Sequence, residues 1–385
     1  STAFPSTGLL EHPQSVGPME ITDLECIPVA MDVKPRAEPD GLAPYVTNHG
    51  AVETMERMLI RLETSDGVTG WGEMRTTLSA ASTATVIEHD LAPELIGREV
   101  WEIEAFANAF FYEYMDTRTF VGGVEMAMWD ALGKYRDAPV HQLLGGKTTD
   151  AVEFAYCVGI LSPEESRPHA RRALEGGYSV LKTKAGRDWR QDVARIVAMH
   201  DEADGALEFR LDPNQGWNFE DAVRVGAMLE DENIYLQYME QPIRIDSFGT
   251  MKRLRSRLKT PIAANEDMYF PRNLLQMGRA DAIDVGVVDI IPAGGILGMK
   301  RLAGVAGDLG ISLSHHCAFD LGIKTAAVVH AVASTPEINL PPDTVYYAWE
   351  DDVITDPFTI TDGTIAVPDA PGLGIEVDEA KVEQY

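Results

Sequence analysis

The stretch VLKTKAG, Val180 to Gly186, places two lysines on either side of a single threonine after a short apolar run. Such a run is typical of a buried β-strand, in which residues i and i+2 lie on the same face. Lys182 and Lys184 are therefore predicted to point the same way. Two ammonium groups this close repel each other, and the repulsion favours loss of a proton from one of them, as a base requires.

Short apolar runs of this kind recur from about Ala151 onwards, and their repetition decides the fold. Helical patterns such as WRQDVARIVAMHDEAD separate eight of them: VEFAYCVGI, SVLKTKAG, LEFRLDPNQ, IYLQYMEQP, PIAANED, AIDVGVVDI, ISLSHHC and EINLPP. Apolar strands alternating with helices predict an α/β fold with a parallel sheet buried on both faces, and eight units predict a closed barrel. A doubly wound open sheet is the alternative, but CVGILSPEE after the first strand is not the glycine-rich phosphate loop typical of such sheets.

Four segments are predicted along the chain. Residues 1–18 have neither a basic region nor an apolar core, so we interpret them as a flexible arm and not as a signal peptide. Residues 19–150 mix strand-like and helical runs and predict a small α+β domain, and residues 151–343 form the barrel. The tail, residues 344–385, leaves the strand–helix rhythm and is expected to pack back on the N-terminal domain.

The charge excludes some function classes. Of 385 residues, 61 are acidic and 32 basic, which gives a net charge of -29 and disfavours nucleic-acid binding. Such an excess predicts a halophilic source, where salt screens self-repulsion, and an ordinary acidic enzyme is the alternative. No apolar run reaches about 18 residues, so no transmembrane helix is predicted. Three scattered cysteines without CxxC spacing favour a reduced, cytoplasmic setting.

A polar residue closes each of six successive strand-like runs. From Lys184 these residues are spaced by 28, 28, 26, 23 and 27 positions, and they are Lys184, Asp212, Glu240, Glu266, Asp289 and His316. Each interval is about one strand–helix repeat. Because active sites of such barrels lie at the carboxyl ends of the strands, the six side chains are predicted to surround one mouth.

Three carboxylates on neighbouring strands, Asp212, Glu240 and Glu266, would repel each other unless a cation lies between them. All-oxygen ligation suits Mg²⁺, with Mn²⁺ as a substitute. The alternative is that the three acids are paired with arginines.

The remaining strand-end residues predict proton transfer. Lys184, beside a second lysine and a divalent cation, is a candidate general base. His316 is a candidate acid or base on the other side, and Asp289 one repeat earlier would orient its ring. His315 has the opposite parity and is expected to be packed or solvated. A cation between two bases suggests removal of a proton α to a carboxylate, with the metal stabilising the ene-diolate.

These residues resemble the enolase superfamily, and within it the mandelate racemase-like group, over nearly the whole chain. GVTGWGE (67–73) and MAMWDALGKYRDAPVHQLLGGK (126–147) are similar to its capping-domain segments. The barrel motifs of the family resemble KTK (182–184), DPNQ (212–215), EQP (240–242), NE (265–266), VVDIIPAGGI (287–296) and SHH (314–316). The resemblance implies a modified TIM barrel of the (β/α)7β type, with an α+β capping domain formed by the N-terminal segment plus the C-terminal tail.

The resemblance also implies roles. Asp212, Glu240 and Glu266 would bind Mg²⁺, Lys184 would be the base on one face, and His316 with Asp289 would be acid or base on the other. Lys182 would neutralise the substrate carboxylate, and Asn214 would contact substrate or a metal-bound water. Structural roles are expected for Glu73, Trp129 and the LLGG turn (143–146).

Two regions depart from the pattern or carry specificity. In the family, the eighth strand usually ends in a glutamate that hydrogen-bonds the developing ene-diolate. This chain has EINLPPD (337–343) there, so either Asp343 substitutes for the glutamate or this hydrogen-bond donor is absent. Specificity in the family is read by capping-domain loops, and in PRAEPDGLAPYVTNHG (35–50) the candidate substrate contacts are Tyr45, Asn48 and His49. An ordinary surface loop is the alternative, and Trp349 is a weaker candidate.

The pattern favours dehydration of a sugar acid to a 2-keto-3-deoxy acid, because members with both a lysine base and a histidine–aspartate pair are more often dehydratases than racemases. Racemisation or epimerisation of a 2-hydroxy acid is the main alternative. Cycloisomerisation is third, since strand six ends in Asp289 and not in the lysine of muconate-cycloisomerase-like members. An inactive binding relative is the non-enzyme alternative. The expected partners are a small-molecule carboxylate and further copies of the chain in a homo-oligomer.

Overall fold

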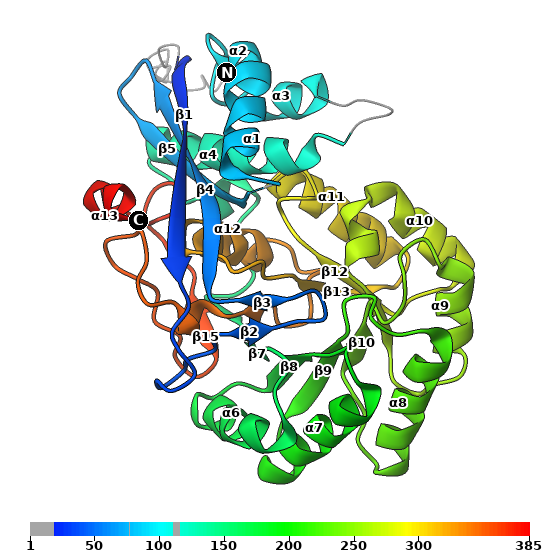
Figure 1. Cartoon of the computed structure of the whole chain (residues 1–385). Coiled ribbons are helices and arrows are strands. Elements are labelled where there is room, and N and C mark those ends of the chain that lie inside the picture. Colours follow the sequence, from blue (N-terminus) through cyan, green and yellow to red (C-terminus); the bar gives the residue numbers. More distant parts are fainter. Residues whose placement is uncertain (1–18, 77, 111–115) are drawn as a thin grey trace, which may run out of the picture.

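The computed structural model describes residues 19–76, 78–110 and 116–385, so the arm predicted for residues 1–18 lies outside the described residues. A barrel forms the larger part of the molecule, and an antiparallel sheet with its helices lies against one side of it (Figure 1). The predicted α/β barrel with a capping layer is confirmed.

Eight parallel strands build the barrel in the order β13-β12-β11-β10-β9-β8-β7-β14. The last strand pairs with β7 through Asp343 and Ala155, while a bridge between Leu313 and Ile338 joins the chain before β14 to β13. These two contacts close the ring. The strands are β7 (Ala155–Val158), β8 (Val180–Lys184), β9 (Glu208–Asp212), β10 (Tyr238–Glu240), β11 (Ile262–Ala264), β12 (Val285–Val288), β13 (Ser312–His315) and β14 (Asp343–Thr344).

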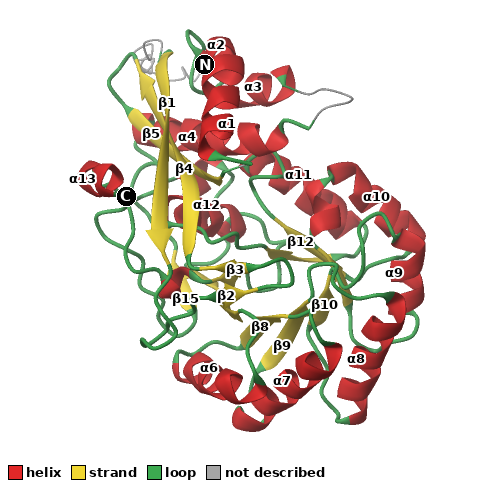
Figure 2. Cartoon of the chain, viewed as in Figure 1, coloured by secondary structure: helices red, strands yellow, loops and turns green. Residues whose placement is uncertain are grey.

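Helices follow the first seven barrel strands and surround them (Figure 2), which gives the (β/α)7β order. In α8, for example, the buried residues Ala222, Val225, Gly226 and Leu229 follow the helical period and form the face that packs inward. The barrel helices are α6 (Pro163–Glu175), α7 (Trp189–Glu202), α8 (Phe219–Asp231), α9 (Phe248–Arg255), α10 (Pro271–Ala280), α11 (Ile296–Asp308) and α12 (Gly322–Ala333).

The N-terminal layer is an antiparallel sheet in the order β1-β4-β5, and its helix α4 packs on β5. Gly70 and Gly72 permit that contact, because a Cβ at either position would collide with a backbone carbonyl of α4. The elements are β1 (Ile21–Asp32), β4 (Thr54–Thr64), β5 (Thr69–Arg75), α1 (Ala80–Thr85), η1 (Val86–Leu91), α2 (Ala92–Leu95), α3 (Ile103–Ala109), α4 (Arg118–Tyr135) and α5 (Val140–Leu143).

A short hairpin leaves this layer between β1 and β4 and extends toward the barrel strands (Figure 1). It consists of β2 (Tyr45–Val46) and β3 (Ala51–Val52), which pair antiparallel. The hairpin reaches the barrel, because the backbone amide of Ile160, just after β7, donates to the carbonyl of Val46.

The C-terminal segment contacts both parts of the molecule. Val33 and Trp349 form a bridge beside β1, and the amide of Leu373 donates to Asp130 in α4. On the barrel side, β15 (Thr364–Ala366) pairs with β6 (Ala151–Glu153). The remaining elements of the segment are η3 (Tyr346–Ala348) and α13 (Glu379–Gln384). The segment therefore ties the N-terminal layer to the barrel.

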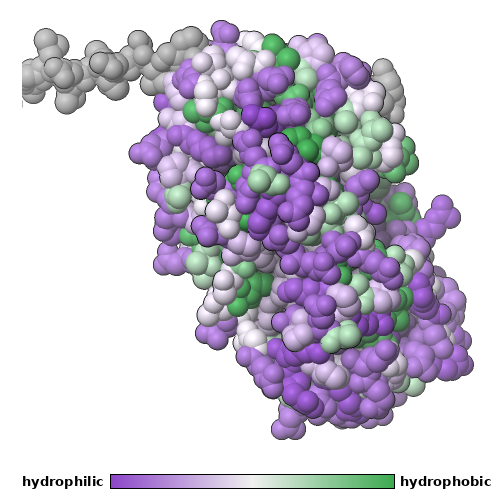
Figure 3. Space-filling model, turned by 60° about the vertical axis from the view of Figure 1, so that its left-hand side comes forward, coloured by the Kyte–Doolittle hydropathy of each residue, from purple (hydrophilic) through white to green (hydrophobic). Residues whose placement is uncertain are grey.

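The surface agrees with the charge of the sequence. On the face seen in Figure 3, hydrophilic residues dominate and hydrophobic ones are scattered. Within the described part of the chain, no helix combines the length and the apolar character needed to cross a membrane.

Candidate active site

A cavity of about 280 Å³ lies at the carboxyl ends of the barrel strands, beneath the β2–β3 hairpin. Three of the six predicted strand-end residues, Lys184, Glu266 and His316, line it, whereas Asp212, Glu240 and Asp289 lie behind the wall and contact it through Lys184, Lys182 and His316. The predicted site residues that line it include Lys182, Lys184, Asn214, Glu266, His316 and Asp343. The spacing of one residue per strand–helix repeat therefore does gather these side chains at one mouth.

The two lysines of β8 point toward the carboxylates of neighbouring strands. The Nζ of Lys182, whose residue is 2% exposed, lies 2.7 Å from both carboxylate oxygens of Glu240 and 2.6 Å from Oδ2 of Asp343. It also lies 3.1 Å from Oδ2 of Asp212, an atom that Lys184 Nζ approaches to 2.6 Å. Both lysines thus lie on the cavity side of the strand, as the strand parity predicts.

The carboxylates respond to burial and to each other. Burial raises the pKa of Asp212, but Lys182 and Lys184 outweigh it, so the net pKa lies below its usual value. Burial and the charge of Asp212 raise the pKa of Glu240 to about 8, in spite of its contact with Lys182. The same two causes raise the pKa of Glu266. The cluster therefore holds more negative charge than its lysines neutralise.

Glu266 has a free acceptor atom. Its Oε1 accepts from Gln215 Nε2 at 3.2 Å and from Asn214 Nδ2 at 3.5 Å, while its Oε2 is buried without a hydrogen-bond partner in the described part of the chain. A buried carboxylate oxygen without a donor is costly, and a cation would satisfy it.

These observations fit Mg²⁺ by charge and by donor type, since the acids outnumber the cations around the cluster and all donors are oxygens. The acids are Asp212, Glu240, Glu266 and Asp343, and the cations are Lys182, Lys184 and Arg210. As they stand, however, no three acidic, histidine or cysteine side chains of the described residues enclose a common point suited to a metal ion. The ammonium group of Lys182 serves Asp212 and Glu240 instead.

His316, on another part of the wall, is paired with Asp289 behind it. Nδ1 of His316 lies 3.2 Å from Oδ2 of Asp289, and Asp289 Oδ1 accepts from the amide of Ile291 at 2.9 Å. The ring of Tyr269 stands edge-on to His316 with the centroids 6.2 Å apart. His315, on the opposite face of β13, is buried and accepts from the amide of Ile290, and burial lowers its pKa to about 4.

The loops after β9 and β10 contain left-handed backbone at non-glycine residues, with φ of 45° at Asn214, 65° at Gln215 and 33° at Gln241. Such conformations cost energy and concentrate at functional sites. Here they turn the amide of Asn214 back to Oδ1 of Asp212 at 3.0 Å.

The capping-loop candidates differ in position. Tyr45 and His49 line the cavity. Asn48 is not among the described residues that line it, and its side chain lies against Gly186 and Gly216. Trp349 is buried and donates from its indole to the carbonyl of Asp320.

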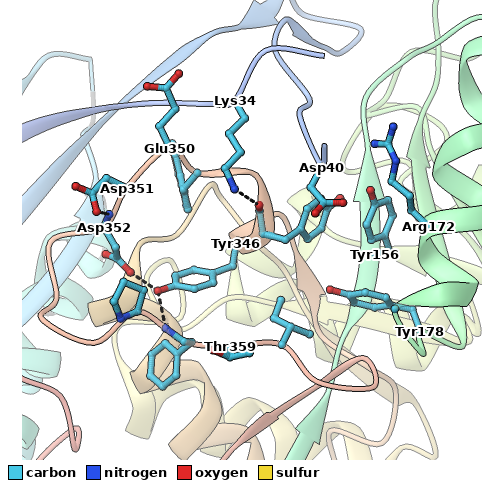
Figure 4. Close-up of a pocket in the computed structure, with 16 residues that line it drawn as sticks. Lys34, Asp40, Tyr156, Arg172, Tyr178, Tyr346, Glu350, Asp351, Asp352 and Thr359 are labelled. Atoms are coloured by element: carbon cyan, nitrogen blue, oxygen red, sulfur yellow. Dashed lines mark hydrogen bonds between the residues drawn. The ribbon is translucent and has the colours of Figure 1, made fainter. Parts of the chain in front are cut away.

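Trp349 borders a different cavity, of about 460 Å³, between the barrel and the C-terminal segment. Tyr156, Tyr178 and Tyr346 project into this region together with Lys34 and several acids (Figure 4). None of the predicted strand-end residues lines it. The smaller cavity at the barrel mouth is therefore the candidate active site.

Sequence reasoning missed Arg75, the last residue of β5, which lines the barrel-mouth cavity. Its guanidinium makes no hydrogen bond or ion pair that the described part of the structure shows. The signal available in the sequence is a cation at the end of the strand TGWGEMR.

Two family models match the chain. One, described as the mandelate racemase / muconate lactonizing enzyme N-terminal domain, matches residues 30–145, and the other, described as enolase C-terminal domain-like, matches residues 165–381. The chain belongs to the mandelate racemase/muconate lactonizing enzyme family of the enolase superfamily.

Relatives in the family carry different names. Over 338 residues the chain is 30% identical to the L-Ala-D/L-Glu epimerase of Bacillus subtilis, covering 86% of this chain and 92% of that protein. It is also 30% identical over 372 residues to the probable glucarate dehydratase of Streptomyces coelicolor, covering 85% and 83%. The structure of muconate lactonizing enzyme from Pseudomonas fluorescens, complexed with muconolactone, has a TM-score of 0.88 at 26% identity, covering 96% and 100%.

Members of the mandelate racemase/muconate lactonizing enzyme family are enzymes that in general depend on Mg²⁺ and act on small-molecule carboxylates. The names of the three relatives describe three different reactions, those of an epimerase, a probable dehydratase and a lactonizing enzyme. Family membership alone therefore does not determine which of these reactions the protein catalyses.

Proposed function

We propose that the protein is a Mg²⁺-dependent dehydratase of a sugar acid, an aldonate or aldarate. The observation that carries the proposal is the meeting of Lys184 and His316 in one cavity, with Asp212 against Lys184 and Asp289 against His316. Lys184 comes from β8 and His316 follows β13, three strands apart around the closed ring. Two proton carriers can therefore reach different positions of one small substrate.

The chain's own residues divide the reaction between them. In the proposal, Lys182 neutralises the substrate carboxylate, and Lys184 Nζ takes the proton from the α-carbon. His316, protonated at both ring nitrogens, gives the proton on the nitrogen that does not face Asp289 to the departing β-hydroxyl and becomes the neutral Nδ1–H tautomer. The C–H and C–O bonds break, a C=C bond forms, and water leaves; the resulting enol tautomerises to the 2-keto-3-deoxy acid. A bound Mg²⁺ supplies positive charge where negative charge develops on the carboxylate, and Asp212, Glu240 and Glu266 would hold it.

A racemase or epimerase of a 2-hydroxy acid is the second candidate. The same two proton carriers favour it if both address one carbon, and the 30% identity to an epimerase is consistent with it. The two reactions differ in whether a C–O bond breaks.

A sugar-acid library separates them. We expect 2-keto acid, detected with semicarbazide, from at least one aldonate or aldarate in the presence of Mg²⁺, and loss of turnover after EDTA treatment that Mg²⁺ restores. Deuterium incorporation at the α-carbon of a hydroxy acid, without keto product from any library member, would establish the racemase instead. Full turnover in EDTA-treated protein would contradict the metal proposal.

Arg75 provides a prediction about substrate length. Because the proposal assigns the first carboxylate of the substrate to Lys182, and Arg75 lines the same cavity without an ion pair in the described structure, we expect a second acidic group of the substrate to bind Arg75. Arg75→Gln should raise KM for an aldarate about ten- to a hundredfold, as expected for a hydrogen bond to a charged group. The matching aldonate, which lacks the second carboxylate, is the control, and equal changes for both would contradict this role.

A further inference from the structure

A row of buried charged side chains connects the N-terminal sheet to His316. Arg57 on β4 donates from Nε to Glu73 at 2.8 Å and from Nη2 to Asp320 at 3.2 Å. Lys324 Nζ lies 2.9 Å from the same Asp320 oxygen and 3.0 Å from Oδ2 of Asp289. That Oδ2 is the atom that faces Nδ1 of His316. Acids and cations therefore alternate from β5 to the wall of the cavity.

Lys324 is the cation that contacts Asp289 of the catalytic pair. It stands in the first turn of α12 and is 0% exposed. Burial lowers its pKa, but the charges of Asp289 and Asp320 outweigh burial and leave the pKa raised. A lysine kept charged in the interior is costly unless it is paired, and this ammonium group is paired with two carboxylates, those of Asp289 and Asp320.

Asp289 depends on Lys324 for its own charge. Burial raises the pKa of Asp289, and Lys324 is the largest of the influences that bring it below its usual value. With Oδ1 accepting from Ile291, Asp289 is an acceptor at both oxygens. An ionised Asp289 accepts from Nδ1–H of His316, which leaves Nε2 for the cavity.

We propose that Lys324 is a positioning residue for His316: its ammonium group holds Asp289 as a hydrogen-bond acceptor, and Asp289 in turn holds the His316 ring with Nδ1–H inward. The catalytic meaning of this arrangement rests on the proposed function, in which His316 Nε2 delivers the proton. The arrangement of Lys324, Asp289 and His316 does not itself depend on the proposed function. Tyr269, whose ring stands edge-on to His316, donates its hydroxyl proton to Asn265, and the described part of the structure shows no hydrogen bond from it to Asp289.

The N-terminal sheet fixes the place of Lys324. Both oxygens of Glu73 accept amide protons from the start of α12, from Leu321 at 2.8 Å and from Lys324 at 2.8 Å. A structural role is expected for Glu73 from the sequence. The contacts specify that role, because Glu73 holds the first turn of α12, and Lys324 reaches Asp289 from this turn.

The test uses a spectroscopic readout that needs no substrate. In the full-length Mg²⁺-loaded protein with ¹⁵N-labelled histidine, the ring signals of His316, assigned through a His316→Asn variant, should show the Nδ1–H tautomer. In Lys324→Met the same signals should shift to the Nε2–H tautomer or to a mixture. If the methionine variant does not fold, Lys324→Gln replaces it in the test, because glutamine keeps an N–H donor but not the charge. The same shift is expected.

Lys300→Met is the matched control, because Lys300 is a part-buried lysine of α11 that donates to Ser334 and Thr335. It should leave the His316 signals unchanged. With a turned-over sugar acid, Lys324→Met should lower elimination on the order of 10²- to 10⁴-fold while α-proton exchange into D2O continues within about tenfold. An unchanged His316 tautomer, or elimination and exchange falling together, would overturn the proposal. Absence of dehydration by the wild-type protein would overturn only the proposed function.

Discussion

Replacing Lys184 by methionine is expected to remove α-proton transfer, with kcat for dehydration falling on the order of 10³- to 10⁴-fold or more. Lys184 Nζ touches Asp212 Oδ2 at 2.6 Å, and its side chain is 12% exposed toward the cavity, so no other described lysine with comparable access can replace it. Lys182 is 3% exposed at its side chain and is held by three carboxylates. Methionine keeps most of the side-chain volume, which separates loss of the base from loss of packing. The measurement is kcat together with α-proton exchange in D2O.

His316→Asn is the reciprocal control for Lys184→Met. It should lose elimination and keep the exchange of the α-proton, since Lys184 remains, whereas Lys184→Met should lose both. The assignment of Lys184 would be wrong if its methionine variant retained turnover within about tenfold of the wild type. Equal exchange in the two variants would show instead that the two residues act on the same carbon, as in the racemase.

The barrel could be predicted from the sequence because its signals are local. Each strand is a short apolar run, and each strand end adds one polar residue at an interval set by the length of a strand–helix unit. That is why Lys184, Glu266 and His316, which are far apart in the chain, line one cavity as predicted. The eighth strand is harder to predict from the sequence, because Pro341 and Pro342 have no amide N–H to donate to a neighbouring strand. The structure replaces one continuous run with a bridge at Ile338 and the two-residue β14.

Contacts between distant segments could not be predicted in this way. Lys324 opens the apolar helix GIKTAAVVHAVA, and nothing in that local pattern indicates that it lies between Asp289 and Asp320. The position of Asn48 over Gly186 depends on how the β2–β3 hairpin meets the barrel. The sequence offers Asp343 as a substitute for the hydrogen-bonding glutamate of strand eight, but Lys182 and Arg210 outweigh the effect of its burial and keep its pKa low. As the structure stands, it is an acceptor in an ion pair.

The same network that reaches His316 predicts a large loss of stability when Arg57 is replaced by methionine. Its guanidinium, with a side chain 0% exposed, joins Glu73, Asp320 and the carbonyl of Ala318. Removing one partner of a buried ion pair leaves uncompensated charge, and the cost is about 3 to 5 kcal/mol of unfolding free energy. We expect this loss by denaturant unfolding, with a lower Tm.

Arg61→Met is the matched control, because Arg61 lies on the same strand, four residues along, with its side chain 30% exposed and paired with Glu25 and Glu63. A surface pair of this kind contributes about 1 kcal/mol or less. If the two variants lost equal stability, burial of the Arg57 pair would not be the cause, and the network would have no special weight in holding α12 to the sheet. If Arg57→Met alone is destabilised, and its His316 tautomer also shifts, the charges that stabilise the junction of the two layers are the same charges that position the proton carrier.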